Sequence, residues 1–163
     1  MNQFADFRIA VLGHGRVGRG DATHRCIQLL EGMLLASYSL RVRHAFAYIR
    51  GEFDLPLRRL QGALEEARAA GLVGENILGS GFACDIVIHR GAGAYVCGEE
   101  SSLINSLEGK KGFPRNKPPF PAVKGLFQKP TVVNNVETLA TVPWILLNGA
   151  SQYAAMGAKK TPG

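Results

Sequence analysis

The 163-residue sequence predicts an α/β fold, a Rossmann-like three-layer sandwich with a mostly parallel sheet. Segments with helical spacing of apolar residues alternate with short apolar runs, the pattern of parallel strands joined by helices. Hydrophobic residues make up 46% of the chain and charged residues 20%, a composition that excludes a disordered chain. No apolar run reaches the roughly 18 residues of a membrane span, so we expect no direct membrane span.

The individual elements follow from apolar periodicity and from the residues that end each segment. Strands are expected at residues 5–12, 44–49 and 84–89. Helices are expected at residues 24–40, 56–70, 101–107 and 134–148, with one more turn at 151–156. Pro56 suits the first turn of its helix and Gly71 the end, whereas Pro143 should interrupt or kink the helix that contains it.

Residues 110–131 hold five of the eight prolines, which excludes a regular helix and predicts a long, constrained loop. The loop is also basic. Residues 109–163 carry eight basic and one acidic side chains, whereas residues 51–108 carry four and nine. The lysines of the loop do not line one helix face, so we expect no nucleic acid. A phosphate-bearing ligand or an acidic partner is favoured.

The first candidate site is Gly13-His14-Gly15-Arg16-Val17-Gly18, directly after the first expected strand. This GxGxxG spacing lets a backbone approach a pyrophosphate at the start of a helix. The acidic residue expected about 20 positions further on is absent, because Glu52 lies too far along the chain. Dinucleotide binding and a glycine loop of no special role both stay open.

The second candidate runs from Gly91 to Ser102, where a strand ends, glycines follow and a helix begins. The free N–H groups at a helix start carry partial positive charge, and a flat cofactor can lie against a backbone that has no Cβ. Tyr95 offers an aromatic face for stacking or belongs to the core. Glu99 and Glu100 belong to the site or are ordinary first-turn residues that favour the helix dipole.

The third candidate is Asn134-Asn135-Val136-Glu137-Thr138. Asparagine before a helix is a capping residue, and the same amides with the Thr138 hydroxyl could hold a phosphate at the helix start. No metal site is predicted, because the three cysteines are far apart and the histidines lack ligand spacing. The pattern assigns no catalytic side chain.

Long stretches of the sequence closely resemble the NADH-binding, FMN-containing subunit of respiratory complex I. The same block occurs in diaphorase subunits of NAD-reducing hydrogenases and NAD-linked formate dehydrogenases. The stretches are GAGAYVCGEESSLINSLEG, FPRNKPPFPAVKGLFQKPTVVNNVETL and EGMLLASYSL with YIRGEF. The likeness runs from about His24 to the C-terminus.

The resemblance implies an NADH dehydrogenase in which NADH gives a hydride to FMN, and the flavin passes electrons singly to an iron–sulfur cluster. The residues implied to bind FMN and NAD(H) near the flavin and nicotinamide are Gly91, Gly93, Tyr95, Gly98, Glu99 and Glu100. Those implied to hold the ribityl–phosphate end are Asn134, Asn135 and Thr138. The implied partners are NADH and other subunits of a redox complex, including a small 2Fe-2S subunit. The implied location is the cytoplasm, peripheral to the inner membrane if the parent is complex I.

The sequence departs from the family pattern in three places. The glycine-rich GRGGAGFPTG loop and the acidic NADE segment are absent, and the cysteines of the 4Fe-4S cluster would lie beyond Gly163. We therefore expect a fragment: an unmatched segment at 1–23, the FMN/NADH-binding core at 24–150, and at 151–163 the start of a linker to a ubiquitin-like domain. This chain alone should bind FMN weakly and not turn over NADH. The alternative is a non-enzymatic nucleotide-binding or interaction module that uses Gly13–Gly18 and the basic loop 110–131.

Overall fold

The computed structural model describes residues 8–13 and 22–158. Within them the strands are β1 (Arg8–Gly13), β2 (His44–Ile49), β3 (Asp85–Arg90) and β4 (Thr131–Asn135). The α-helices are α1 (Ala22–Ser39), α2 (Asp54–Ala69), α3 (Glu100–Leu107), α4 (Pro121–Lys124), α5 (Val136–Asn148) and α6 (Ala150–Met156). Short 3-10 turns lie at Ile77–Gly79, Tyr95–Gly98 and Leu126–Gln128.

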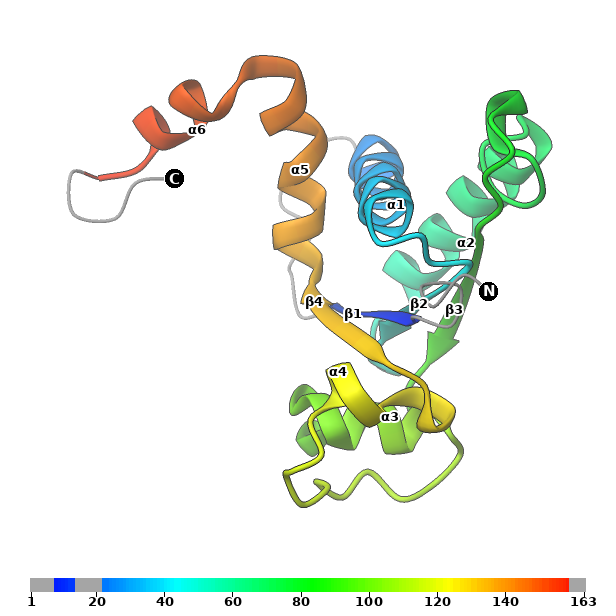
Figure 1. Ribbon diagram of the computed structural model, residues 1–163, viewed down its shortest axis with the longest axis vertical. Helices are drawn as coiled ribbons and strands as arrows, with labels where there is room; N and C mark the ends of the chain where they lie inside the picture. Colours follow the sequence, from blue (N-terminus) through cyan, green and yellow to red (C-terminus); the bar gives the residue numbers. More distant parts are fainter. Residues whose placement is uncertain (1–7, 14–21, 159–163) are drawn as a thin grey trace.

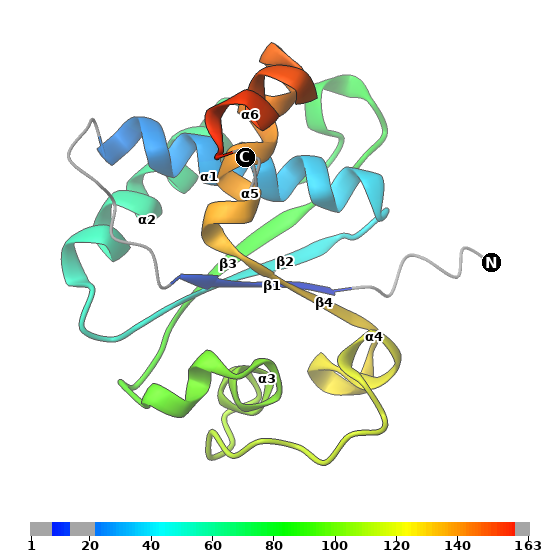
Figure 2. The same ribbon diagram turned by 90° about the vertical axis from the view of Figure 1, so that its left-hand side faces the viewer.

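The described strands form one four-stranded sheet in the order β3-β2-β1-β4, and all three pairings between neighbours are parallel. Parallel neighbours need connections that cross a face of the sheet. The helices α1, α2 and α5 cover one face, and α3 and α4 cover the other (Figures 1 and 2). The predicted α/β sandwich with a mostly parallel sheet is therefore confirmed.

The sheet separates two apolar cores, and the alternation of side chains along β2 shows how. Ala45 and Ala47 pack in a core formed with α1, α2 and α5. Phe46 and Tyr48 pack in a second core with α3 and the turn at Leu126. One strand therefore supports helices on both faces, and the second core fixes α3 beneath the sheet.

Gly32 allows α1 and α5 to pack in direct backbone contact. A Cβ at this position would overlap the carbonyl oxygen of Leu139 and stand 2.7 Å from its carbonyl carbon. Leu139 lies one turn into α5 and is buried in the first core. The glycine of the EGMLLASYSL stretch is therefore required by the packing of the helix that follows β4.

The structure differs from the expectations from the sequence at the junction of β4 and α5, at Pro143 and at α4. Asn134 and Asn135 are the last residues of strand β4, and helix α5 begins only at Val136. Pro143 lies inside α5 without interrupting it, so the interruption expected there is wrong, while a kink at this proline stays a prediction. The other strands and helices that the sequence predicts begin and end within two residues of the expected bounds, while residues 5–7 of the first expected strand lie outside the described residues. The short helix α4 lies in the proline-rich segment expected to be an irregular loop, and Pro121 occupies its first turn, where a proline is tolerated. No described helix is long and apolar enough to cross a bilayer.

Candidate functional site

All four described strands end at one edge of the sheet, on the left in Figure 2. This carboxyl edge is where open α/β sheets bind ligands. The nine predicted residues lie in two segments that leave it: one joins β3 to α3, and the other joins β4 to α5. The ends of β2 and β1 lie between them, so three strand spacings, roughly 14 Å, separate the two strand ends. An elongated ligand suits two strand ends at this separation.

Gly91 is buried at the end of β3, and its lack of a side chain has a structural cause. Its N–H donates to the Ile49 carbonyl at 2.7 Å, and a Cβ here would stand 2.6 Å from the Tyr48 Cζ. The turn after β2 is packed against it just as closely, since a Cβ at Gly51 would overlap the Gly91 carbonyl oxygen. Glycine at 91 is therefore needed to build the carboxyl edge itself, apart from any ligand.

The next residues, Gly93, Tyr95 and Gly98, are exposed. Gly93 has a φ of +85°, which favours glycine, and the nearest atom to a Cβ there would be the Glu52 Oε1 at 3.8 Å. Tyr95 is 85% exposed, so the interpretation of its ring as core is wrong. The segment presents uncovered backbone and one free aromatic face at the carboxyl edge.

Glu99 is the N-cap of α3. Its carboxylate accepts hydrogen bonds from the Ser102 N–H at 2.9 Å and from the hydroxyls of Ser101 and Ser102. Partial burial raises the pKa of Glu99, but these donors and Lys117 outweigh it and lower the pKa to about 2. Glu99 therefore carries its charge at neutral pH and stabilises the start of α3 as its N-cap.

Lys117 reaches both glutamates from the proline-rich loop. Its Nζ lies 3.1 Å from the Glu99 Oε1 and 2.5 Å from the Glu100 Oε1. The hydrogen bonds to Glu100 and then to Glu99 raise the pKa of Lys117. Sequence reasoning missed this residue, because 18 and 17 positions separate it from its partners. The one signal for it was the acidic middle of the chain followed by a basic loop.

The second segment is the junction of β4 and α5. Asn135 caps α5, and its Oδ1 accepts a hydrogen bond from the Glu137 N–H at 2.8 Å. The capping role predicted for it is confirmed. Asn135 and Thr138 are exposed and Asn134 is half-buried. A helix of 13 residues brings partial positive charge to this point of the edge.

The GxGxxG candidate starts at the last residue of β1. Residues 14–21 lie outside the described residues, so the nucleotide-binding interpretation of this loop stays a prediction. β1 itself pairs with β2 on one side and β4 on the other. The segment before residue 24 therefore supplies a central strand of the sheet.

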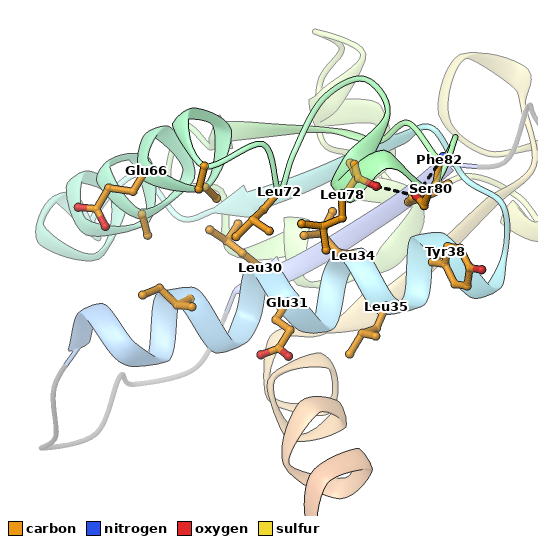
Figure 3. Close-up of a pocket in the computed structure, with 15 residues that line it drawn as sticks. Leu30, Glu31, Leu34, Leu35, Tyr38, Glu66, Leu72, Leu78, Ser80 and Phe82 are labelled. Carbon is orange, nitrogen blue, oxygen red and sulfur yellow. Dashed lines mark hydrogen bonds between the residues drawn. The ribbon is translucent and has the colours of Figure 1, made fainter.

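A cavity of about 640 Å³ lies elsewhere, between α1, α2 and the connection from α2 to β3 (Figure 3). Its lining is mainly apolar and includes Leu30, Leu34, Tyr38, Leu72 and Phe82. The nine predicted residues are all outside it. A phosphate-bearing ligand needs convergent polar donors, so the carboxyl edge is the better candidate.

The described residues contain no group of three or more His, Cys, Asp or Glu that could hold a metal ion. Cys26, Cys84 and Cys97 are free and buried. Burial raises the pKa of the Cys26 and Cys84 thiols, which leaves them neutral at pH 7.

The chain is similar to known proteins over most of its length. A family model described as the Nuo51 FMN-binding domain matches residues 21–144. An NADH-quinone oxidoreductase subunit from Mycobacterium tuberculosis is 56% identical over 135 residues, which cover 83% of this chain and 30% of the relative. The corresponding protein from Rickettsia bellii is 55% identical over 136 residues, covering 83% and 33%.

A solved structure is similar over almost the whole chain. The crystal structure of an NAD+-reducing NiFe-hydrogenase in the H2-reduced state has a TM-score of 0.80 and 38% identity. The similarity covers 98% of this chain and 27% of that chain. The chain thus spans about a third of the length of the relatives it matches.

Proposed function

The chain belongs to the family of the Nuo51 FMN-binding domain, and from this premise we propose that it forms the core of the flavin site in an NADH dehydrogenase flavoprotein. Bound FMN would supply the chemistry, accepting a hydride from NADH and releasing electrons one at a time. The described residues would bind and orient the two cofactors. The iron–sulfur cluster that takes the electrons would lie outside this chain.

The described residues fit FMN at the carboxyl edge of the sheet. FMN is elongated, with a flat ring system at one end and a phosphate at the other. The uncovered backbone around Gly93 and Gly98 and the exposed ring of Tyr95 suit the flat end. The start of α5, with Asn135 and Thr138 exposed, suits the phosphate. The observation that supports the proposal is that β3 and β4 end at one edge of the sheet, roughly 14 Å apart, and that the chain continues from each strand end to the start of a helix.

The remaining predicted residues take two roles in this proposal. Gly91 builds the floor of the site through its contact with Tyr48. Glu99 and Glu100, which pair with Lys117, would place a charged group beside the nicotinamide and flavin. Asn134, the residue before the α5 cap, would contact the ribityl–phosphate end.

The relatives' names support a place in a larger redox assembly. We infer that the partners are other subunits of such an assembly, including a small 2Fe-2S subunit, and that the 4Fe-4S cluster belongs to a region outside this chain. We also infer that residues 24–150 form the cofactor-binding core.

A comparison of FMN with riboflavin tests the proposal, because the two differ only in the phosphate. Quenching of flavin fluorescence on titration with the 163-residue chain should show micromolar or weaker binding of FMN, and weaker binding still of riboflavin. Asn135→Ala should weaken FMN binding about five- to tenfold, which corresponds to about 1 kcal/mol, and leave riboflavin unchanged.

Asn148→Ala is the matched control, since Asn148 lies at the other end of α5 and donates only to the Trp144 carbonyl in the described contacts. FMN and riboflavin of equal affinity, or equal effects of the two asparagine variants, would contradict the proposed phosphate site.

The alternative of an interaction module that uses the basic loop is less well supported. Lys110, Arg115 and Lys117 of that loop form ion pairs with glutamates of the same chain. These charges are therefore already neutralised within the molecule and attract an acidic partner less strongly.

A further inference from the structure

Residues 113–117 of the proline-rich loop lie along α3 and run antiparallel to it; we call them the α3 strap. The Asn105 Nδ2 donates to the Phe113 carbonyl at 2.7 Å near the end of the helix. The Arg115 N–H donates to the Ser101 Oγ at 2.8 Å one turn earlier, and Lys117 pairs with Glu99 and Glu100 at the helix start. The strap therefore spans α3 from end to end.

Arg115 makes most of the strap's contacts. Its Nε donates to the Asn105 Oδ1 at 2.8 Å, and its Nη1 donates to the Gly125 carbonyl at 3.1 Å. Its Nη2 is buried and forms an ion pair with the Glu108 Oε2 at 2.8 Å, at an angle outside hydrogen-bond geometry. The planar guanidinium thus ties the strap to α3 and to the turn before β4.

Glu108 makes this attachment rigid, because its side chain is only 3% exposed. Burial raises the pKa of Glu108, but Arg115, then Lys110 and the Phe127 N–H, outweigh it and lower the pKa. The Phe127 N–H donates to the second carboxylate oxygen at 2.8 Å. A buried carboxylate with these partners keeps Arg115 in place, since loss of Arg115 would leave the carboxylate with one partially exposed cation, Lys110.

Lys117 has no such anchor of its own. Its side chain is 30% exposed, and an exposed ion pair of a flexible, strongly hydrated ammonium group does not fix its own position. It lies two residues after Arg115, so the strap determines where its backbone stands.

We propose that Arg115 is a positioning residue: by fixing the strap on α3 it places Lys117 between Glu99 and Glu100, and so sets the charge that this helix start presents. The statement that this charge faces a flavin rests on the proposed function. The placement of Lys117 by Arg115 is independent of the proposed function.

The carboxyl pKa of Glu99 reports the placement without any cofactor. Carbon-13 NMR titration of the side-chain carboxyl groups in the 163-residue chain should give a Glu99 pKa of about 2. Lys117→Ala should raise it, as the reference. Arg115→Ala and Asn105→Ala should raise it in the same direction, by about one unit, the low end of the effect of a neighbouring opposite charge. Arg115→Lys should not restore it, because an ammonium cannot replace the planar fork.

Lys110→Ala is the matched control. Lys110 lies 2.7 Å from the same Glu108 carboxylate but outside the strap, so its loss should leave the Glu99 pKa unchanged. Amide dispersion in the same samples shows whether each variant folds. If Arg115→Ala does not fold, the Glu99 pKa in Asn105→Ala tests the proposal, because this variant leaves the Arg115–Glu108 pair intact. A Glu99 pKa that stays near 2 in folded strap variants, while Lys117→Ala raises it, would overturn the proposal.

Titration of the same variants with FMN separates this inference from the proposed function. Release of Lys117 leaves the two glutamates unneutralised, so FMN, an anion, should bind several-fold more weakly. A raised Glu99 pKa with unchanged FMN affinity upholds the placement of Lys117 and counts against the flavin site.

Discussion

Replacement of Gly32 by alanine tests whether the packing of α1 on α5 fixes the start of α5. A Cβ there would overlap the Leu139 carbonyl oxygen and stand 2.7 Å from the carbonyl carbon, and ordinary contact begins at 3.4 Å. The helices must therefore separate by at least 3.4 − 2.7 = 0.7 Å. The obstacle is backbone and cannot rotate away, so we take the upper end of overpacking costs, about 3 kcal/mol. Alanine in a helix interior returns about 1 kcal/mol, which leaves a net destabilisation of about 2 kcal/mol.

Gly62→Ala is the control, because Gly62 lies inside α2 and a Cβ there would meet nothing within 4 Å. The same substitution should stabilise the protein by about 0.5–1 kcal/mol through helix propensity alone. Urea unfolding followed by circular dichroism measures both free energies. A Gly32→Ala protein as stable as the wild type would show that α5 adapts freely, and that the contact does not fix the position of Asn135.

Three other outcomes are expected. The pKa of Glu99 is about 2, below the ordinary 4.5, so this carboxylate stabilises the fold above about pH 5 and loses that contribution as pH falls towards 2. With 36% of the side chain exposed, about 1–2 kcal/mol remains after screening, and urea titrations should show a shallower acid decline for Glu99→Gln; parallel declines would contradict this. Tyr48→Phe removes the bond to the Ser106 hydroxyl at 3.0 Å and should lower the free energy of unfolding by about 1 kcal/mol; an unchanged urea midpoint would show the bond dispensable. Asn135→Ala should lose an N-cap worth about 1 kcal/mol and lower Tm, whereas equal Tm values for it and Asn148→Ala would deny the cap.

The sequence predicts the periodic part of the fold well. The 44–49 strand and the two long helices before and after it follow from the spacing of their apolar residues. The same apolar residues then pack between the helices and the sheet. β4 was missed because it has five residues and ends in two asparagines, which local reasoning assigns to the helix that follows. Asn135 is both the last residue of β4 and the N-cap of α5, so the strand and the helix adjoin without a loop between them.

The sequence predicts those parts of the candidate site that depend on residues close together in the chain. A glycine run before a helix and an asparagine cap are visible in the sequence, and both lie at the carboxyl edge. The strand order puts the ends of β2 and β1 between the two segments. This order depends on which face of the sheet each connecting helix crosses, and local sequence patterns do not show that. The reason for Gly91 is likewise nonlocal, since the obstructing ring belongs to Tyr48 on the neighbouring strand.

The charge pattern shows how nonlocal order shapes the site. The acidic middle and basic loop suggested an external partner, yet they meet along α3, an eight-residue helix too short to be stable alone. Leu103 and Ile104 bury its inner side beneath the sheet, and Arg115 and Lys117 bind its outer side. Because α3 depends on both sides for its order, and because Lys117 binds Glu99 and Glu100 directly, a change in the strap should alter the start of α3.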